Sequence, residues 1–390
     1  MLTFTGFSVL ALALSVTQVL AVGTALGFGS ATTGGGSATA AVPSSNAELL
    51  SWLADSTQRV ILLESVYDFT DYYGTTTGKI CKPWTCTPDP QVAIDQNDWC
   101  ENYEPSASTG TATWYNSGTS YSYSLKVGSK KTLLGKGSSG GIKGIGLLIE
   151  DADNVIIQNI KISDINAEFV WGGDAIAIVG STHVWIDHCY VENVGRQFIA
   201  TGYDPAKDVT ISNNIFDGRV TYSATCYGDH YWGFIFTGTS DTITFNQNYV
   251  YHTSGRGPHI GGTSGYTQYL HIVNNYYVDV GGHAVDAEVG AVTLVEGNYF
   301  NTVTTPSLNS NPDGSEYFLQ SSTDASSCAS SLGRTCQTNT LLSSGSVTAV
   351  LDSAVLSAFS SQSAITGYSP LTAQAAATYV QANAGLGIVN

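Results

Sequence analysis

The sequence predicts an all-β fold, a right-handed parallel β-helix with long loops and a helical and irregular C-terminal tail. The main observation is an alternating apolar run that ends in asparagine and returns, with starts roughly 22 to 34 residues apart, at 209–214, 243–248, 270–275 and 292–298. A repeat of this length is typical of stacked coils. In each run the first and third residues are apolar and the second and fourth are mostly polar, as in a strand with one buried face. A β-sandwich of unrelated short strands is the alternative.

The asparagines that end these runs predict a ladder along the coils. Asparagine tolerates the left-handed backbone bend between two strands, and its amide can bond to the neighbouring coil. Two more runs, 155–160 and 184–189, keep the same register with the terminal asparagine replaced. The 42 glycines and the 12% of charged residues suit a long stack with many tight corners.

An apolar stretch begins the chain and ends in small residues near Ala21. We interpret residues 1–21 as a secretory signal peptide, although no Lys or Arg precedes Arg59. A transmembrane anchor is the alternative, and the glycines at 34–36 argue against it. The protein is therefore expected to be secreted, without membrane contact after cleavage, and residues 22–390 to form one elongated domain.

Along this domain the elements are expected in the following order. A short helix at 46–53 is placed to cover the hydrophobic end of the first coil. Residues 67–126 show little periodicity and are expected to form a large loop region held by disulfides. The coils proper are expected at about 130–303, and the tail at 304–390 contains an alanine-rich helical segment around 373–382.

Seven cysteines in a secreted chain predict disulfides and one unpaired thiol. Cys189 lies at a bore-facing strand end and is the candidate for the free, buried and inert thiol. The sequence leaves the pairing of the others open. The disulfide candidates are Cys81, Cys86, Cys100, Cys226, Cys328 and Cys336.

The formal net charge of −17 limits the class of partner. A strongly acidic protein repels nucleic acid, anionic membranes and heavily ionised polyuronates at ordinary salt concentrations. A neutral or cationic polymer is the expected substrate, and no nucleic-acid partner is expected.

A second series of strands in the same coils carries Asp174, Arg196 and Arg256. Asp174 and Arg196 are one turn apart and, because parallel strands lie about 4.8 Å apart, they are expected to form an ion pair. Arg256 lies roughly two coils further on, a gap that a long side chain can span. Each residue alone could be an ordinary turn or surface residue. Two guanidiniums and one carboxylate on one sheet, in a chain with 14 basic residues, are more than random decoration would supply.

Several longer motifs surround these residues. They are Phe169-Val-Trp-Gly-Gly-Asp-Ala-Ile176, Val184-Trp-Ile-Asp-His188, Val194-Gly-Arg-Gln197, Asp217-Gly-Arg219, Tyr222-Ser-Ala-Thr-Cys226, His230-Tyr-Trp-Gly233, His252-Thr-Ser-Gly-Arg-Gly-Pro258 and Gly282-His-Ala284. In this order they resemble the pectin lyases of polysaccharide lyase family 1, over roughly residues 29 to 340. The resemblance implies a right-handed parallel β-helix that cleaves methyl-esterified polygalacturonate by β-elimination, without a metal or other cofactor. It assigns the catalytic residues: Arg256 matches the proton-abstracting arginine, and Asp174 and Arg196 match the pair beside it.

The chemistry of this reaction explains the residue types. Elimination removes the C5 proton of a uronate and expels the oxygen at C4, and a methyl ester makes that proton more acidic because the enolate adds no second negative charge. Arg196 would bond to the developing enolate oxygen, which typically stabilises a transition state by ~3 to 4 kcal/mol per donor, and Asp174 would hold Arg196 in place. Arg256 is an unusual base, since the pKa of arginine lies above ~12. Burial and a second positive group would lower this pKa.

A calcium-dependent pectate lyase on the same fold is the main alternative. Such enzymes resemble this chain at Trp185–His188 and Arg256, but they gather several carboxylates around calcium. Here Arg196 and Gln197 stand where acidic ligands would be needed, so no metal site is expected. Cys189 is a mild indication in the other direction, because pectate lyases also carry Cys at this position.

Two further classes remain as alternatives. A hydrolase on the same solenoid would need two suitably spaced acidic residues, for which Asp286 and Glu288 are the candidates. A non-catalytic β-helix that binds cell-wall polymers would use the arginines only to dock acidic sugars.

Aromatic residues near the proposed site offer apolar faces for sugar rings. For each of them, ordinary packing beneath a long loop is the alternative. His259 follows Arg-Gly-Pro where the family often has Lys or Arg, and it is a weaker, pH-dependent cation. The candidate substrate-binding residues are Trp84, Trp99, Trp171, Tyr231, Trp232 and His259. The expected partner is the methyl-esterified pectin polymer, bound by a monomer.

Overall fold

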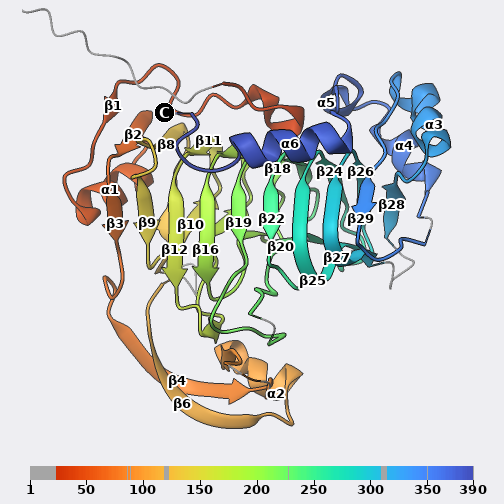
Figure 1. Ribbon diagram of the computed structural model, residues 1–390. Coiled ribbons are helices and arrows are strands. Elements are labelled where there is room, and N and C mark those ends of the chain that lie inside the picture. The colour runs from red at the N-terminus through yellow and green to blue at the C-terminus, as the bar shows by residue number, and fades with distance from the viewer. Residues whose placement is uncertain are drawn as a thin grey trace, which may run out of the picture.

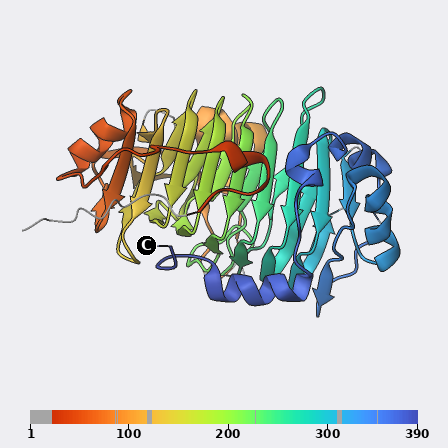
Figure 2. The ribbon, with the colours of Figure 1, turned by 90° about the horizontal axis from the view of Figure 1, so that it is seen from above.

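The strands of the protein stack side by side into one elongated body (Figure 1). The computed structural model describes residues 23–85, 87, 89–117, 123–226, 228–308, 314–348 and 350–389. The expected signal peptide and the disulfide candidate Cys86 lie outside these described residues. Seen from above, the chain runs from its N-terminal to its C-terminal region along the length of the stack, and a group of helices lies at the C-terminal end (Figure 2).

Two large sheets form the walls, and their strand pairs are parallel. The first sheet contains β1 (Ala40–Ala41), β2 (Arg59–Leu63), β8 (Lys131–Gly135), β11 (Asp153–Gln158), β15 (Thr182–Asp187), β18 (Lys207–Ser212), β21 (Thr242–Asn246), β24 (Gln268–Val273), β26 (Ala291–Glu296) and β28 (Ser315–Phe318). Since β2 pairs with β8, a turn of parallel strand precedes residue 130. The parallel β-helix predicted from the repeats is therefore confirmed.

The second sheet consists of two strand series that meet at one long strand, β25 (Tyr276–Ala287). One series is β3 (Val66–Asp68), β9 (Gly141–Lys143), β12 (Lys161–Ile165), β16 (Tyr190–Val194), β19 (Ile215–Asp217) and β22 (Tyr249–Tyr251). The other is β7 (Leu125–Lys126), β10 (Leu147–Glu150), β14 (Ile176–Val179), β17 (Ile199–Thr201), β20 (Phe234–Phe236) and β23 (His259–Ile260). Beyond β25 lie β27 (Tyr299–Leu308) and β29 (Thr340–Leu342).

The bore between these walls is filled by the inward-facing residues of the alternating runs. Phe198, Phe216, Phe234 and Phe245 are fully buried there. The ring centroids of Phe216 and Phe234 are 4.6 Å apart and those of Phe234 and Phe245 4.9 Å apart, both edge to face. Interlocked aromatic rings resist deformation, so the central coils are a rigid base for the wall outside them.

The predicted asparagine ladder is present. Asn214, Asn248, Asn275 and Asn298 are fully buried, and each donates its amide to the side-chain oxygen of the next, at 2.9, 3.0 and 2.9 Å, with Asn298 passing the bond on to Asn339 at 3.0 Å. The left-handed bend belongs to the residue before each ladder asparagine, for example Gln247 with φ +55°. The two roles that the sequence assigned to one asparagine are thus divided between neighbours.

One helix covers the N-terminal end of the bore, and another lies against the outside of the stack. The predicted N-terminal helix is α1 (Asn46–Ala54), which starts at the side-chain cap of Ser45 and buries Leu49 and Leu53 against the main core. The predicted tail helix is α6 (Ala373–Asn383), which lies along the outside of the stack (Figure 1) and packs Val380 on Tyr276 of β25. The remaining helical segments are η1 (Gly27–Ala31), η2 (Gln96–Asp98), α2 (Trp99–Tyr103), α3 (Ser322–Leu332), α4 (Ser353–Phe359) and α5 (Ser363–Thr366).

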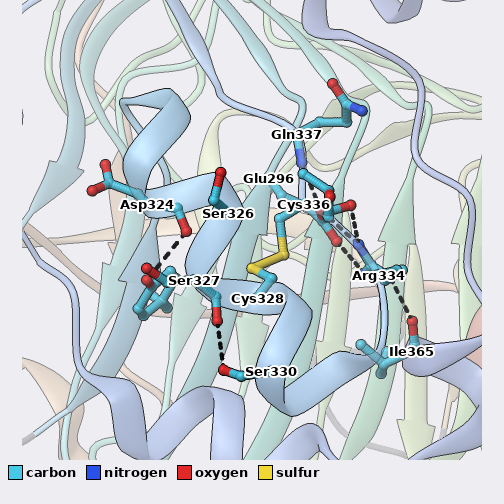
Figure 3. Close-up of a disulfide and its surroundings, with 12 residues drawn as sticks. Glu296, Asp324, Ser326, Ser327, Cys328, Ser330, Arg334, Cys336, Gln337 and Ile365 are labelled. Atoms are coloured by element: carbon cyan, nitrogen blue, oxygen red, sulfur yellow. Dashed lines mark hydrogen bonds and ion pairs between the residues drawn. A yellow bond between two sulfur atoms is a disulfide. The ribbon is translucent and has the colours of Figure 1, made fainter.

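A disulfide closes a short loop within the C-terminal region, and a buried ion pair fastens this loop to the last coils (Figure 3). Cys328 of α3 is bonded to Cys336. Two residues before Cys336, Arg334 reaches the carboxylate of Glu296, with Nη1 3.1 Å from Oε2. His271 contacts the same carboxylate through Nε2 at 2.8 Å. These bonds to Arg334 and His271 outweigh burial and lower the pKa of Glu296 to about 2.

A small third sheet stands out from the stack, at the bottom of Figure 1. It consists of β4 (Thr75–Lys82), β5 (Val92–Ile94), β6 (Ser108–Tyr115) and β13 (Phe169–Val170), with β4 and β6 antiparallel. A loop region without regular structure was expected for most of it, since pairing between distant strands produces no local repeat.

None of the described helices is long and apolar enough to cross a membrane.

Candidate active site

Asp174, Arg196 and Arg256 come together directly before β14, β17 and β23 of the second sheet. Arg196 Nη1 lies 3.3 Å from Oδ2 of Asp174, the expected ion pair. The other oxygen of Asp174 accepts the backbone N–H of Gln197 at 2.8 Å. These contacts follow from the parallel pairing of β14 with β17, which sets the two preceding turns side by side.

Arg256 lies further along the same wall, before β23. Burial first, and then the charge of Arg196, lower the pKa of Arg256 to about 10. The neutral form therefore exists at pH 7 in roughly one molecule in a thousand. Its backbone has φ +47°, a left-handed conformation that is uncommon outside glycine.

Each guanidinium lies over an indole ring. Cζ of Arg196 is 4.0 Å from the ring centroid of Trp171, and Cζ of Arg256 is 4.8 Å from that of Trp232. Such contacts attract the cation to the ring face and orient it. The two tryptophans thus hold both arginines against the wall.

A groove of about 810 Å³ runs along this wall. Of the predicted catalytic and substrate-binding residues, Asp174, Trp171, Arg196 and His259 line it. The other lining residues are Gln96, Asn97, Ser124, Leu147, Ala177, Val179, Ala200, Thr201, Gly202, Tyr203, Ile235, Thr237, Gly261, Gly262, Thr263 and Glu288. The exposed ring of Tyr203 and the carboxylate of Glu288 were not among the sequence candidates.

Two groups of aromatic rings adjoin the arginines. Near Arg196, Trp99 meets Trp171 edge to face at 6.4 Å and stacks on Tyr103 at 6.0 Å. These rings line a second hollow of about 350 Å³ that shares Trp171 with the groove. Near Arg256, Trp232 meets Tyr231 at 4.9 Å and Trp84 at 6.2 Å, counted between ring centroids. Of the five predicted aromatic residues, Trp171 and Trp232 therefore contact a guanidinium, and the other three contact one of these two tryptophans.

The disulfide Cys81–Cys100 lies in the buried cluster on which the tryptophan rings pack. Its two buried cysteines form a cluster with Val170, against which Trp84, Trp99, Trp171 and Trp232 pack. Cys226 is also disulfide-bonded, and Cys189 is a buried free thiol. The pKa of Cys189 is raised to about 12, chiefly by burial, so it is unreactive.

Two buried residues that the sequence did not single out join the arginine turns. Gln91 accepts the indole N–H of Trp232 at 2.9 Å and donates to the carbonyl of Gly195 at 3.0 Å. His230 donates Nε2–H to the carbonyl of Arg196 at 2.7 Å, and burial lowers its pKa to about 4. The motif around His230 was visible in the sequence, whereas Gln91 lies in the aperiodic segment and left no signal.

At the far side of Arg256, Nδ1 of His259 lies 2.8 Å from Oδ2 of Asp286. Glu288 completes a group whose ligand atoms lie within 4.8 Å of one another. The other such group in the described part of the chain is Asp95, Asp98 and Glu101, which Lys79 already neutralises in part. Asp174 belongs to neither group, so the carboxylate beside Arg196 stands apart from both clusters that could hold a cation.

The chain matches one family model and is similar in sequence to several fungal proteins. Residues 138–322 match the family model described as right handed beta helix region. The chain is 46% identical over 341 residues to pectin lyase B of Emericella nidulans, covering 87% of each chain. It is 44% identical over 385 residues to the probable pectin lyase A of Aspergillus clavatus, covering 97% of this chain and 98% of the other.

Solved structures share the fold at lower identity. The pectate lyase from Bacillus sp. N165 in complex with trigalacturonate superposes with a TM-score of 0.58 at 18% identity. The match covers 94% of this chain and 100% of the other. The pectate lyase from Acidovorax avenae subsp. citrulli has a TM-score of 0.57 at 17% identity, covering 98% and 99% of the two chains. These matches agree with the predicted fold and its handedness.

Proposed function

The chain belongs to the pectin lyases and is a polysaccharide lyase, and on this premise we propose that Arg256, Arg196 and Asp174 carry its β-elimination of methyl-esterified polygalacturonate. The observation that supports this assignment most directly is the lowered pKa of Arg256, about 10, next to an Arg196 that is itself held by Asp174. A base must be deprotonated in part, and a neighbouring cation promotes this.

In the proposed reaction the neutral guanidine of Arg256 takes the C5 proton of a galacturonate ester. The electron pair left at C5 moves toward the ester carbonyl, where Arg196 hydrogen-bonds the enolate oxygen. The pair then forms the C4=C5 double bond as the C4–O bond breaks, and the leaving oxygen takes a proton from water. Asp174 touches no reacting atom and acts as a positioning residue for Arg196.

The groove charges favour an ester over a free acid as substrate. Asp174 neutralises Arg196 at 3.3 Å, and Glu288 adds a negative charge to the lining. When Arg256 is neutral and able to act as the base, a free carboxylate at the reacting sugar would meet Arg196, which Asp174 largely compensates, in a strongly acidic protein. We propose that the enzyme is metal-independent and endo-acting, with the chain of sugars lying along the groove across successive coils.

The aromatic groups beside the arginines are proposed as sugar-binding platforms. Trp171, Trp99 and Tyr103 border one hollow that continues from the groove, and Trp232, Tyr231 and Trp84 adjoin Arg256. The exposed ring of Tyr203, which is 69% exposed, adds a further face within the groove.

We also propose that the mature protein begins after Ala21, is secreted, and works as a monomer on pectin polymers. The apolar start of the sequence and the disulfides support secretion.

The decisive experiment is incubation with highly methylated pectin in excess chelator, following the ultraviolet absorbance of the new double bond. We expect the same initial rate with and without chelator, and a much lower rate on polygalacturonate with calcium. A rate that requires calcium and prefers polygalacturonate would identify a pectate lyase. Chain shortening without new absorbance would identify a hydrolase.

The role of Arg256 is tested by Arg256→Lys. The lysine keeps a positive charge but not the guanidine, and we expect kcat to fall at least about 100-fold. The matched control is Arg219→Lys, since Arg219 is an exposed arginine on the series of β19, paired with Asp217. Activity near wild type in Arg256→Lys would show that this side chain is not the base.

A further inference from the structure

The side chain of His283 is bonded to the backbone of Arg256. The N–H of Arg256 donates to Nε2 of His283 at 3.0 Å, and the imidazole is largely buried. A backbone N–H can only donate, so Nε2 must present its lone pair. While this bond exists the imidazole is neutral and carries its proton on Nδ1.

The bond matters because Arg256 has an unusual backbone conformation, with φ +47°. Three hydrogen bonds hold the turn around it. The carbonyl of Arg256 accepts the N–H of Phe234 at 2.6 Å, and the N–H of Gly257 donates to the carbonyl of Ala284 at 2.9 Å. The third is the bond to His283. It is the one bond of these three that involves a side chain.

The segment that carries His283 approaches the Arg256 turn very closely. A Cβ at Gly282 would collide with the backbone oxygen of Ser254, two residues before Arg256. Glycine at this position is therefore required to bring the imidazole within reach of the Arg256 N–H.

We propose that His283 is a positioning residue for Arg256, and that its neutral imidazole is needed to hold the base in place. The inference rests on the proposed role of Arg256 as the base. It adds a second, titratable requirement to that role, because a protonated His283 has no acceptor to offer the N–H.

The charged groups around His283 are Arg256 and His259 on one side and Asp286 on its own strand, while the ring of Tyr231 meets it edge to face. Burial is the main cause that lowers the pKa of His283, Asp286 opposes this, and electrostatic interaction with His259 and Arg256 adds to it. The imidazole therefore stays neutral into mildly acidic solution and becomes charged at lower pH.

Protonation of His283 would have two opposite effects on Arg256. A charged His283, in addition to Arg196, would lower the pKa of Arg256 further, which by itself favours the neutral base. The lost hydrogen bond would release the turn. A fall in kcat at acidic pH that depends on His283 would therefore arise from the displaced Arg256 turn and not from the change in the pKa of Arg256.

The test compares His283→Gln with His283→Leu on methylated pectin across the acidic and neutral range. The amide oxygen of Gln can accept the Arg256 N–H but does not titrate, whereas Leu offers no acceptor. We expect His283→Gln to keep kcat within about threefold at neutral pH and to lose the part of the acid-side fall that His283 causes. We expect His283→Leu to lower kcat about 30-fold or more with KM within about twofold, since a small misplacement of a catalytic group is costly.

Two results would overturn the proposal: a kcat for His283→Leu close to wild type, or an unchanged acid-side profile in His283→Gln. The unfolding midpoint of each variant shows whether it folds, and if the Leu variant does not, the profile of the Gln variant decides alone. Arg256→Lys separates this failure from failure of the proposed function. An active Arg256→Lys rejects Arg256 as the base, whereas an inactive Arg256→Lys with an active His283→Leu rejects only the positioning role.

Discussion

The asparagine ladder and the arginine site bury polar groups in the same coils in opposite ways. Asn214, Asn248 and Asn275 are neutral, fully buried, and bonded at their amide and carbonyl atoms. In the arginine site, Arg256 is charged, adjoins a second cation, and has a left-handed backbone. A satisfied neutral ladder stabilises the stack, whereas an incompletely compensated cation costs stability and becomes chemically useful.

This comparison predicts that changes at the arginine site affect the reaction and spare the fold. In Arg196→Gln the enolate would lose its charged donor, and we expect kcat to fall roughly 100- to 1,000-fold. The unfolding midpoint should change little, since the Asp174 pair is partly exposed, and initial rates on methylated pectin measure the loss. Lys126→Gln, which removes an exposed pair with Glu150 in the same strand series, is the control and should keep its rate. Equal rates in both variants would contradict the assignment.

The ladder should show the reverse. Asn275→Ala removes the acceptor of the N–H and amide of Asn248, and it also removes the amide that donates to the carbonyl of Phe245. We expect the free energy of unfolding to fall by about 2 to 4 kcal/mol, with kcat per folded molecule unchanged. Denaturant unfolding measures the first and initial rate the second. Asn383→Ala, at the partly exposed last residue of α6, should cost about 0.5 kcal/mol or less. A large loss of kcat in Asn275→Ala would mean that the two regions are coupled.

Glu316 is a third case, a buried carboxyl inside the last coils. It accepts a bond from Ser307 Oγ at 2.7 Å, and burial raises its pKa to about 7. Since the folded pKa exceeds the unfolded one, its contribution to stability is complete below about pH 4.5 and is lost as pH rises through about 7. Glu316→Gln should therefore be more stable than wild type at pH 8 and show no such advantage at pH 4, as measured by thermal unfolding. A stability difference independent of pH would show that Glu316 does not titrate there.

The smallest effect is expected at Trp232, which supports Arg256. Trp232→Phe keeps a ring under Arg256 but removes the indole N–H that bonds to Gln91. We expect kcat to fall about three- to tenfold, because the weaker ring and the lost bond loosen the guanidinium. Steady-state kinetics on methylated pectin measure it, with Trp52→Phe as control, since Trp52 contacts Arg59 near the first coil. A loss as large as that of Arg196→Gln would mean that Trp232 does more than support Arg256.

Most of the wall and part of the site could be predicted from local patterns. The alternation of apolar and polar residues in the runs at 209–214 and 243–248 predicts which side chains face the bore. The spacing of Asp174 and Arg196 by one turn predicts their ion pair. The division of the left-handed bend and the ladder between neighbours, as at Gln247 and Asn248, was not predicted, because both residue types suit either position.

The sequence by itself therefore determined the stack of parallel coils, its asparagine ladder and the resemblance to pectin lyases, because each of these depends on repeated runs or on motifs of contiguous residues. Only the tertiary structure decided how Arg256 is held. The bond from the Arg256 N–H to His283, and the bonds by which Gln91 joins the Arg196 turn to Trp232, connect residues 27 to 141 positions apart in the sequence. Such contacts depend on where aperiodic loops fold back onto the wall, and no local periodicity encodes that path.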